Sequence, residues 1–291
     1  MTQHYIHNIN PIVLEIWGDI AIRWYGLSYM ASFIVAILFL RRWSRLGSFE
    51  VPVREVSNFV VLLAFFGVFI GGRLGYVLFY GFGTFLEDPL SLFKVWEGGM
   101  SSHGGFIGVI LFMLWYARKH GHTFWNLADN MACVTSLGFT FGRLANFING
   151  ELWGRITDVR WGVIFPQSAV PPLHYGQYTL DQVRAMNLPA RHPSQLYQAL
   201  CEGLLVFGIM LLLRRTRLAA RPGGLSACYL LLYALARIAM EFFREPDNGE
   251  FFIAWVSKGQ FYSLLMILGA VVIALKMKIF QGTVRSTDRK A

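Results

Sequence analysis

A polar stretch, GRLANFINGELWGR, follows an apolar run and extends from Gly142 to Arg155. Within it, Arg143, Asn146 and Asn149 are each three residues apart, so on one continuing helix they would share a broad face. A guanidinium fork with amide groups beside it is suited to binding a phosphate diester. The structural alternative is that Arg143 pairs with Glu151 and closes a helix end.

A second polar set consists of Tyr233, Arg237, Glu241 and Arg244, at spacings of four, four and three residues. Ionisable groups inside a bilayer cost several kcal/mol unless they are paired or hydrated. We therefore expect one helical stripe that faces the interior of a helix bundle. With Arg244 at the outer end, Arg237 would lie about 10 Å deep, where a lipid headgroup joins its glycerol. The alternative is an intrahelical Arg237–Glu241 pair, which is compatible with function.

A third candidate is His103, which begins the sequence HGGFIG. Two following glycines would let a ligand approach closely at the start of a helix, because glycine has no side chain. A lone histidine is more often a hydrogen-bonded structural residue. Its predicted position on the same outer side as both arginine groups favours a chemical role.

Other chemistries lack the residues that they need. The sequence contains no HExxH, no GxSxG and no tandem aspartates suited to Mg²⁺. Cys133, Cys201 and Cys228 lie in apolar runs without CxxC spacing, which is typical of packing residues. We expect no disulfide, no metal and no cofactor.

The elements that must position these residues are apolar helices. The composition is 55% hydrophobic and 16% aromatic but only 15% charged, which indicates an all-α, polytopic integral membrane protein. A spanning helix needs roughly 20 mostly apolar residues. Seven segments qualify or nearly qualify: 18–40, 57–80, 103–116, 124–147, 194–213, 225–243 and 260–275.

Basic residues predict the orientation of these helices. The net charge is +9, and the basic residues cluster at the ends of apolar segments. This placement indicates that they set the membrane topology and contact an anionic leaflet, and it does not favour nucleic-acid binding. Alternate connections carry fifteen and eight Lys or Arg residues, and the richer side should be cytoplasmic. The N-terminus is then outside and the C-terminus inside. Residues before Gly18 contain no Lys or Arg, so we also expect no cleaved signal peptide.

Two further features concern packing. Residues 151–193 form the one sizeable hydrophilic insertion, with a strand-like run over 160–165, and should be a small extracytoplasmic cap with some β structure. GxxxG spacing indicates close helix packing. It occurs at Gly67/Gly71, Gly71/Gly75, Gly104/Gly108 and Gly138/Gly142.

Four motifs give the chain a resemblance to a known family. HGGFIG at His103, GRLANFINGELWGR at Gly142, RHPSQLY at Arg191 and YALARIAMEFFREPD at Tyr233 resemble the bacterial prolipoprotein diacylglyceryl transferases. Their order, spacing and seven-helix layout are similar over nearly the whole chain. Phe106 departs from the aliphatic residue expected after HGG, and residues 156–189 match no motif.

The resemblance implies an activity. The family moves the diacylglyceryl group of phosphatidylglycerol onto the lipobox cysteine of a prolipoprotein signal peptide, forms a thioether and releases glycerol phosphate, at the outer side of the bacterial cytoplasmic membrane. Arg143 and Arg237 would stabilise the leaving phosphate, and His103 or Tyr233 would take the thiol proton. A tyrosine's ordinary pKa near 10 favours a neutral donor role for Tyr233. The implied supporting residues are Asn146, Glu151, Gly154, Glu241, Arg244, Tyr25 and Arg73.

Two other classes compete with this interpretation. A transporter or channel would use intramembrane arginines to bind an anionic lipid or solute, and it should show a polar path through both leaflets. A different lipid-headgroup transferase would use the same phosphate clamp. The apolar cytoplasmic halves of the last three predicted helices argue against the transporter.

Overall fold

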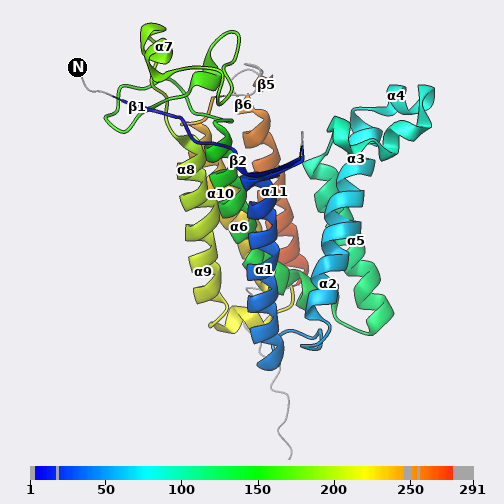
Figure 1. Ribbon diagram of the computed structural model, residues 1–291. Coiled ribbons are helices and arrows are strands. Elements are labelled where there is room, and N and C mark those ends of the chain that lie inside the picture. The colour runs from blue at the N-terminus through cyan, green and yellow to red at the C-terminus, as the bar shows by residue number, and fades with distance from the viewer. Residues whose placement is uncertain (1–3, 18–19, 246–250, 254–255, 278–291) are drawn as a thin grey trace, which may run out of the picture. The chain divides into compact units, whose positions relative to one another are not determined.

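The computed structural model describes residues 4–17, 20–245, 251–253 and 256–277 (Figure 1). The chain forms two compact units. Residues 9–149 make the N-terminal unit, and residues 1–8 with 150–291 make the C-terminal unit.

Among the residues that the structure describes, six helices are long and apolar enough to cross a membrane. Large apolar side chains such as Leu38, Leu205 and Leu268 are exposed on them, as expected where lipid tails cover a protein. The chain is therefore a mostly helical, multi-pass membrane protein. The six spans are Trp24–Arg45, Val56–Phe79, Phe124–Asn149, Ser194–Leu213, Gly224–Glu241 and Gly259–Lys276.

The N-terminal unit contains the first three of these spans and a short hairpin. Helix α1 packs on α6, and α5 packs on η1 and α3. Its elements are β2 (Ile12–Trp17), β3 (Ile20–Arg23), α1 (Trp24–Arg45), α2 (Val56–Leu62), the π-helical η1 (Leu63–Ile70), α3 (Gly71–Phe79), α4 (Phe82–Glu87), the 3₁₀ turns η2 (Pro89–Phe93) and η3 (Val95–Glu97), α5 (Ser102–His120) and α6 (Phe124–Asn149).

The predicted start of the first helix is wrong. Residues 20–23 form β3, which pairs antiparallel with β2, and the helix begins only at Trp24. Alternating isoleucines in IAIR suit a strand as well as a helix, so an apolar run alone could not separate the two. Gly18 itself lies outside the described residues.

The segment predicted to span at 103–116 is α5, with 19 residues. The Ser101 side chain caps its start by accepting from the Gly104 amide, and Gly121 ends it at a φ of 71°. Its first turn is polar and its last turn is basic, so α5 is less apolar than the six helices named above and is not one of them. The count of seven membrane helices stays a prediction.

Close packing of glycines joins α5 to η1 and α3. A Cβ added at Gly104 would lie 2.4 Å from the Gly71 oxygen, and one at Gly108 would lie 2.3 Å from the Gly67 oxygen. The packing interpretation of the GxxxG pairs is confirmed on these helices. Among the described residues, nothing lies within 4 Å of a Cβ added at Gly138 or Gly142. Close helix packing is therefore not seen at this pair in the described residues.

The C-terminal unit contains the last three spans and the segment of residues 151–193, which we call the cap. In Figure 1 the cap lies at one end of this unit's helices and the turn between α9 and α10 at the other. The elements are β1 (Tyr5–Ile6), β4 (Val163–Ile164), η4 (Pro166–Ser168), α7 (Leu180–Ala185), α8 (Ser194–Gln198), the π-helical η5 (Ala199–Leu205), α9 (Val206–Leu213), η6 (Arg217–Ala220), α10 (Gly224–Glu241), β5 (Phe251–Ile253), β6 (Val256–Ser257) and α11 (Lys258–Lys276).

The cap builds its small core with help from the start of the chain. Strand β1 pairs in parallel with β4, so the predicted strand over 160–165 is only two residues long. The fully buried His7 ring stacks on Phe165 at 5.4 Å, and Trp153 stacks on the same ring at 6.1 Å. About 40 residues are too few to bury a core alone, and the N-terminal strand supplies part of it.

Some predicted features lie outside the described residues. They are the basic residues Lys278, Arg285, Arg289 and Lys290, which contributed to the predicted orientation, and Pro246 and Asp247 of the fourth motif.

Candidate functional site

The polar stripe of α10 is present but shorter than predicted. Tyr233 and Glu241 are buried, and the Arg237 side chain is 11% exposed. Helix α10 ends at Glu241, so Arg244 is not on the helix and its place in the stripe was predicted wrongly. The backbone around Arg244 leaves the helix because it pairs with the cap, at Gly154. Arg237 therefore lies about 6 Å from the helix end along its axis.

Arg237 is held between carboxylates from two helices. Its Nη1 donates to Glu241 Oε2 at 2.5 Å, and Glu202 Oε1 of η5 lies 3.8 Å from the same nitrogen. The Ser257 hydroxyl donates to Glu241 Oε1 at 2.7 Å. The Arg237–Glu241 ion pair, the structural alternative, is thus confirmed.

Glu202 and Ser257 were not among the site residues predicted from the sequence. A signal for Glu202 was present, because it is the only acidic residue between Ser194 and Leu213. The rule that singled out Arg237 in an apolar segment applies equally to this glutamate. Ser257 gave no such signal, since a serine at a helix start is ordinary. Its side chain caps α11 by accepting from the Gln260 amide.

Gly154 lies where three backbone segments meet. Its amide donates to the His192 oxygen at 2.9 Å, the Arg155 amide donates to the Phe243 oxygen at 2.9 Å, and Gly154 forms an antiparallel bridge with Arg244. A Cβ at Gly154 would lie 2.5 Å from the Phe243 oxygen and 2.6 Å from the His192 oxygen. Only glycine fits this crossing. Gly154 therefore acts through backbone packing.

The same crossing joins three of the four motifs recognised in the sequence. Arg191 of RHPSQLY donates to the Gly154 oxygen at 3.3 Å and forms an ion pair with Glu245, which follows Arg244. The Arg155 guanidinium donates to the Arg244 oxygen at 3.1 Å. Motifs that are far apart in the chain are thus held at one place in the C-terminal unit.

The start of α8 fixes the loop that contains Glu151. Gln195 Nε2 donates to the Glu151 oxygen at 2.6 Å, and the Ser194 hydroxyl donates to the Leu152 oxygen at 3.1 Å. Leu152 has a φ of 57°, an uncommon conformation for a residue with a side chain. These hydrogen bonds stabilise the turn that presents Glu151.

An aromatic cluster lies beside the crossing. The Trp161 Nε1 donates to Tyr197 Oη at 2.6 Å, and His192 Nδ1 lies 3.3 Å from the same oxygen. The His192 ring meets Phe243 edge-on at 5.3 Å. Burial among these rings lowers the pKa of His192 below its ordinary value, so we assign it to packing.

In the N-terminal unit, Arg143 and Asn146 lie together on α6. The helix continues through Asn149, as predicted, and Arg143 Nη1 donates to Asn146 Oδ1 at 3.5 Å. Asn146 is buried. The predicted continuation of the helix, which places these residues on one broad face, is therefore confirmed.

His103 lies half-buried in the first turn of α5. Gly104 faces the backbone of α3, so it serves helix packing and does not open an approach to the histidine, contrary to our interpretation of both glycines. A Cβ added at Gly105 would make only an ordinary contact, 3.6 Å from the Val68 oxygen. Phe106, the departure from the family pattern, is 51% exposed, so the larger ring is accommodated at the surface.

Arg73 is buried and stabilises a loop. Its guanidinium donates to the backbone oxygens of five residues and lies over the Tyr76 ring, 5.6 Å from the centroid. The acceptors are Ser91, Leu92, Lys94, Gly98 and Gly99. All of its donors are used in this way, so Arg73 is suited to a supporting role.

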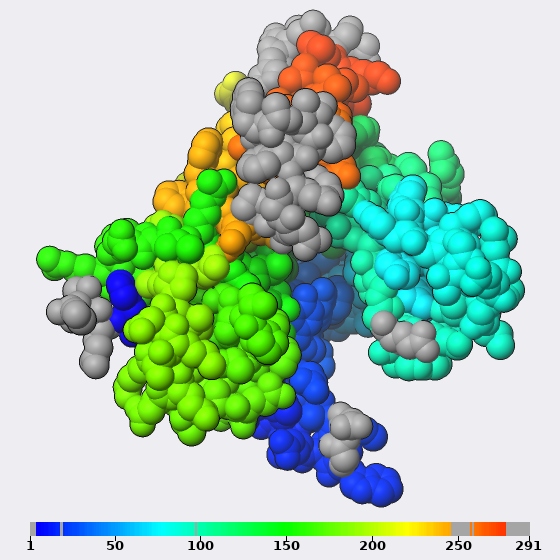
Figure 2. Space-filling view, turned by 90° about the horizontal axis from the view of Figure 1, so that it is seen from above, coloured from blue at the N-terminus to red at the C-terminus, as the bar shows by residue number. Residues whose placement is uncertain are grey.

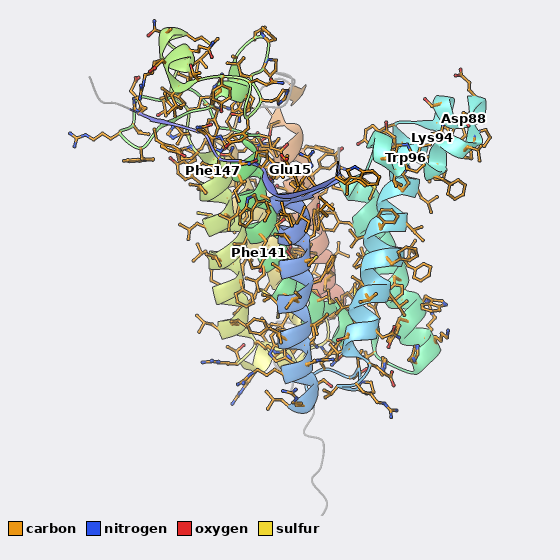
Figure 3. All side chains as sticks on the ribbon, in the orientation of Figure 1. Glu15, Asp88, Lys94, Trp96, Phe141 and Phe147 are labelled. Carbon is orange, nitrogen blue, oxygen red and sulfur yellow. The ribbon has the colours of Figure 1, made fainter. Side chains whose placement is uncertain are left out.

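The loop that Arg73 holds carries its own surface ion pair. Lys94 Nζ donates to Asp88 Oδ2 at 2.8 Å, and this hydrogen bond lowers the pKa of Asp88 (Figure 3). Trp96 is 77% exposed on the same loop. In Figure 2 the loop lies within the cyan region, seen from above. Tyr25, the remaining candidate, is half-buried at the start of α1 with its ring 5.4 Å from that of Tyr29.

Comparisons with known proteins agree with the motifs. The sequence model of the family described as prolipoprotein diacylglyceryl transferase matches residues 11–276. The phosphatidylglycerol–prolipoprotein diacylglyceryl transferase of Stenotrophomonas maltophilia (strain R551-3) is 44% identical over 288 residues, with 94% of each chain covered. That of Sodalis glossinidius (strain morsitans) is 45% identical over 284 residues, covering 94% of this chain and 95% of its own. The chain therefore belongs to the prolipoprotein diacylglyceryl transferase family.

Proposed function

We propose that this protein transfers the diacylglyceryl group of phosphatidylglycerol to the lipobox cysteine of a prolipoprotein. The observation that carries the proposal is the match to proteins of that name along 94% of both chains. Both curated relatives reported above are named as transferases, so the transporter interpretation is not favoured.

In the proposed reaction, the cysteine sulfur attacks the glyceryl carbon next to the phosphate. The carbon–sulfur bond forms, the carbon–oxygen bond breaks, and the electron pair leaves with the phosphate of glycerol phosphate. We assign Arg143 and Arg237 to stabilising this charge, because preorganised cations lower the energy of a transition state that gathers negative charge. His103 accepts the thiol proton, and Tyr233 donates a hydrogen bond to the phosphate.

The supporting residues have physical reasons for their roles. The ion pair with Glu241 fixes one nitrogen of Arg237, and the hydrogen bond from Arg143 orients Asn146. Gly154 permits the crossing that brings in Arg244. We assign Glu151, Tyr25 and Arg73 to the surrounding shell.

We also propose an orientation in the bacterial cytoplasmic membrane. With α5 as the seventh span, the N-terminus lies outside, the C-terminus lies inside, and the cap and the active site face the outer leaflet. The basic cluster Arg214, Arg215, Arg217 and Arg221 at the opposite end from the cap supports this orientation.

The direct test combines purified protein, phosphatidylglycerol vesicles and a synthetic lipobox peptide. Mass spectrometry should find the peptide heavier by one diacylglyceryl group, and it should find glycerol phosphate in equal amount. A Cys→Ser peptide should stay unmodified, because the alcohol is a far weaker nucleophile than the thiolate. Folded protein that gives no diacylglyceryl peptide would refute the proposed function.

A further inference from the structure

Helix α5 has a groove on its surface near its last turn. The groove has a volume of about 430 Å³ and is lined by Leu111, Leu114, Trp115, Arg118 and Lys119. Their spacing of three or four residues along the helix places them on one face of α5. The proposed reaction uses none of these side chains.

The groove faces away from the packed interior of the N-terminal unit. Phe112 and Tyr116, on another face of α5, are buried, and both of their rings contact that of Phe59 in α2. On the groove face, Leu111 is 59% exposed and Trp115 is 49% exposed. Exposed apolar side chains on a membrane-spanning helix contact lipid, so the inference rests on α5 as the seventh span.

The groove changes from apolar to cationic along the helix axis. Leu111 and Leu114 lie toward the middle of α5, and Arg118 and Lys119 lie in its basic last turn. The distance along the axis from Leu111 to Lys119 is about 12 Å, at a rise of roughly 1.5 Å per residue. A phospholipid has the same order, with apolar chains inside the membrane and a phosphate at its surface.

Both cations are available to a ligand at the groove. The Lys119 ammonium lies over the Trp115 ring, 4.7 Å from its centroid, which keeps it beside the groove. Among the residues that the structure describes, neither Arg118 nor Lys119 forms an ion pair with a carboxylate. Basic residues at a helix end also stabilise the helix dipole and set the membrane topology. Neither effect requires an apolar groove beside the cations.

We propose that this groove binds one anionic phospholipid of the surrounding bilayer. The phosphate lies at Arg118 and Lys119, because a guanidinium and an ammonium both bind phosphate oxygens. One acyl chain follows Leu111 and Leu114. Trp115 lies between them, at the level where an indole ring with one polar edge is favoured in membranes.

This lipid site is separate from the proposed active site. His103 is in the first turn of α5, and Lys119 lies about 24 Å further along the axis at a rise of roughly 1.5 Å per residue. One phosphate cannot reach both residues. In the orientation proposed above, the groove takes its lipid from the cytoplasmic leaflet, where basic pockets bind anionic headgroups.

Fluorescence quenching at Trp115 tests the proposal in vesicles that contain the full chain. Mixtures of phosphatidylglycerol and phosphatidylcholine are prepared twice, with bromine on the acyl chains of one lipid or of the other, because bromine quenches a nearby indole. The chain has nine tryptophans, so the signal of Trp115 is the difference between the wild type and Trp115→Phe. The anionic lipid should bind at Trp115 more tightly than the zwitterionic lipid, by about fivefold for each of the two cations.

Charge-neutral variants separate a site from a diffuse attraction. Arg118→Gln and Lys119→Gln should each lower the preference for the anionic lipid about fivefold. Arg54→Gln is the matched control, since the Arg54 side chain is 87% exposed and its loop contacts the end of α5 through the Thr123 amide, which donates to Glu50 Oε2 at 2.5 Å. It should change the preference by less than about twofold. All three positions are exposed, so the variants should unfold at the wild-type temperature in detergent.

Several results would overturn the lipid site. Equal quenching by the two brominated lipids in the wild type would do so, and so would no quenching of Trp115 by either lipid. A loss of preference in Arg54→Gln equal to that in Arg118→Gln would show diffuse attraction in place of a site. The quenching needs no turnover, so a failed transfer assay refutes the proposed function and leaves this result standing.

Discussion

Two arginines in apolar segments show how neighbours decide what a residue does. Arg73 and Arg237 both lie in apolar segments, and sequence alone put both among the site residues. Arg73 gives its donors to backbone oxygens of a single loop, so it stabilises that loop. Arg237 faces carboxylates on its own helix and on η5, an arrangement that orients a guanidinium without enclosing it in backbone.

At Arg237, replacement by lysine should separate charge from shape. Arg237→Lys keeps a cation beside Glu241 but loses the planar fork that suits a phosphate. We expect kcat to fall about a hundredfold, the magnitude typical of losing one preorganised donor. Arg184→Lys is the matched control, because Arg184 is an exposed residue of α7 paired with Asp181 at 2.8 Å. Wild-type kcat in Arg237→Lys would contradict a role for the fork.

At the scale of elements, glycines set the separation of α5 from η1 and α3. Gly108 and Gly104 meet Gly67, Gly71 and Gly75 at distances that leave no room for a Cβ. This contact is local to the N-terminal unit and involves no charged group. It explains why a helix with polar ends packs firmly along its neighbours.

Adding one methyl group should therefore have opposite effects on two helices. Gly108→Ala places a Cβ 2.3 Å from the Gly67 oxygen and should destabilise the protein by about 1–3 kcal/mol. Gly138→Ala in α6 meets no described atom within 4 Å and should be neutral or stabilising by roughly 0.5–1 kcal/mol. Thermal unfolding in detergent micelles measures both. Equal effects of the two variants would rule out close packing as the reason for Gly108.

The helices could be predicted from the sequence for a physical reason. A helix that spans a bilayer needs roughly 20 mostly apolar residues, and these residues are consecutive in the sequence. The start of α1 was missed because β3 is as apolar as the helix that follows. Arg244 was misplaced because its position depends on a backbone pairing with Gly154, which is distant in the chain. The pairing of β1 with β4 is non-local in the same way.

For the whole molecule, the orientation in the membrane can be tested by labelling. Asp181→Cys on α7 should react with a membrane-impermeant maleimide in intact cells, because the cap lies outside in our proposal. Arg217→Cys on η6 should react only after permeabilisation, since its basic neighbours favour the cytoplasm. The wild type supplies the background from its own three cysteines. The reverse labelling pattern would invert the topology.

The backbone crossing at Gly154 also constrains the order of synthesis. Its three segments come from residues 154–155, 191–192 and 243–244, so it cannot form until the ribosome has made the chain past Arg244. Earlier helices can enter the membrane while that partner is still missing. In the living cell, the nascent chain must therefore wait until α10 has been made before this part of the protein takes its final form.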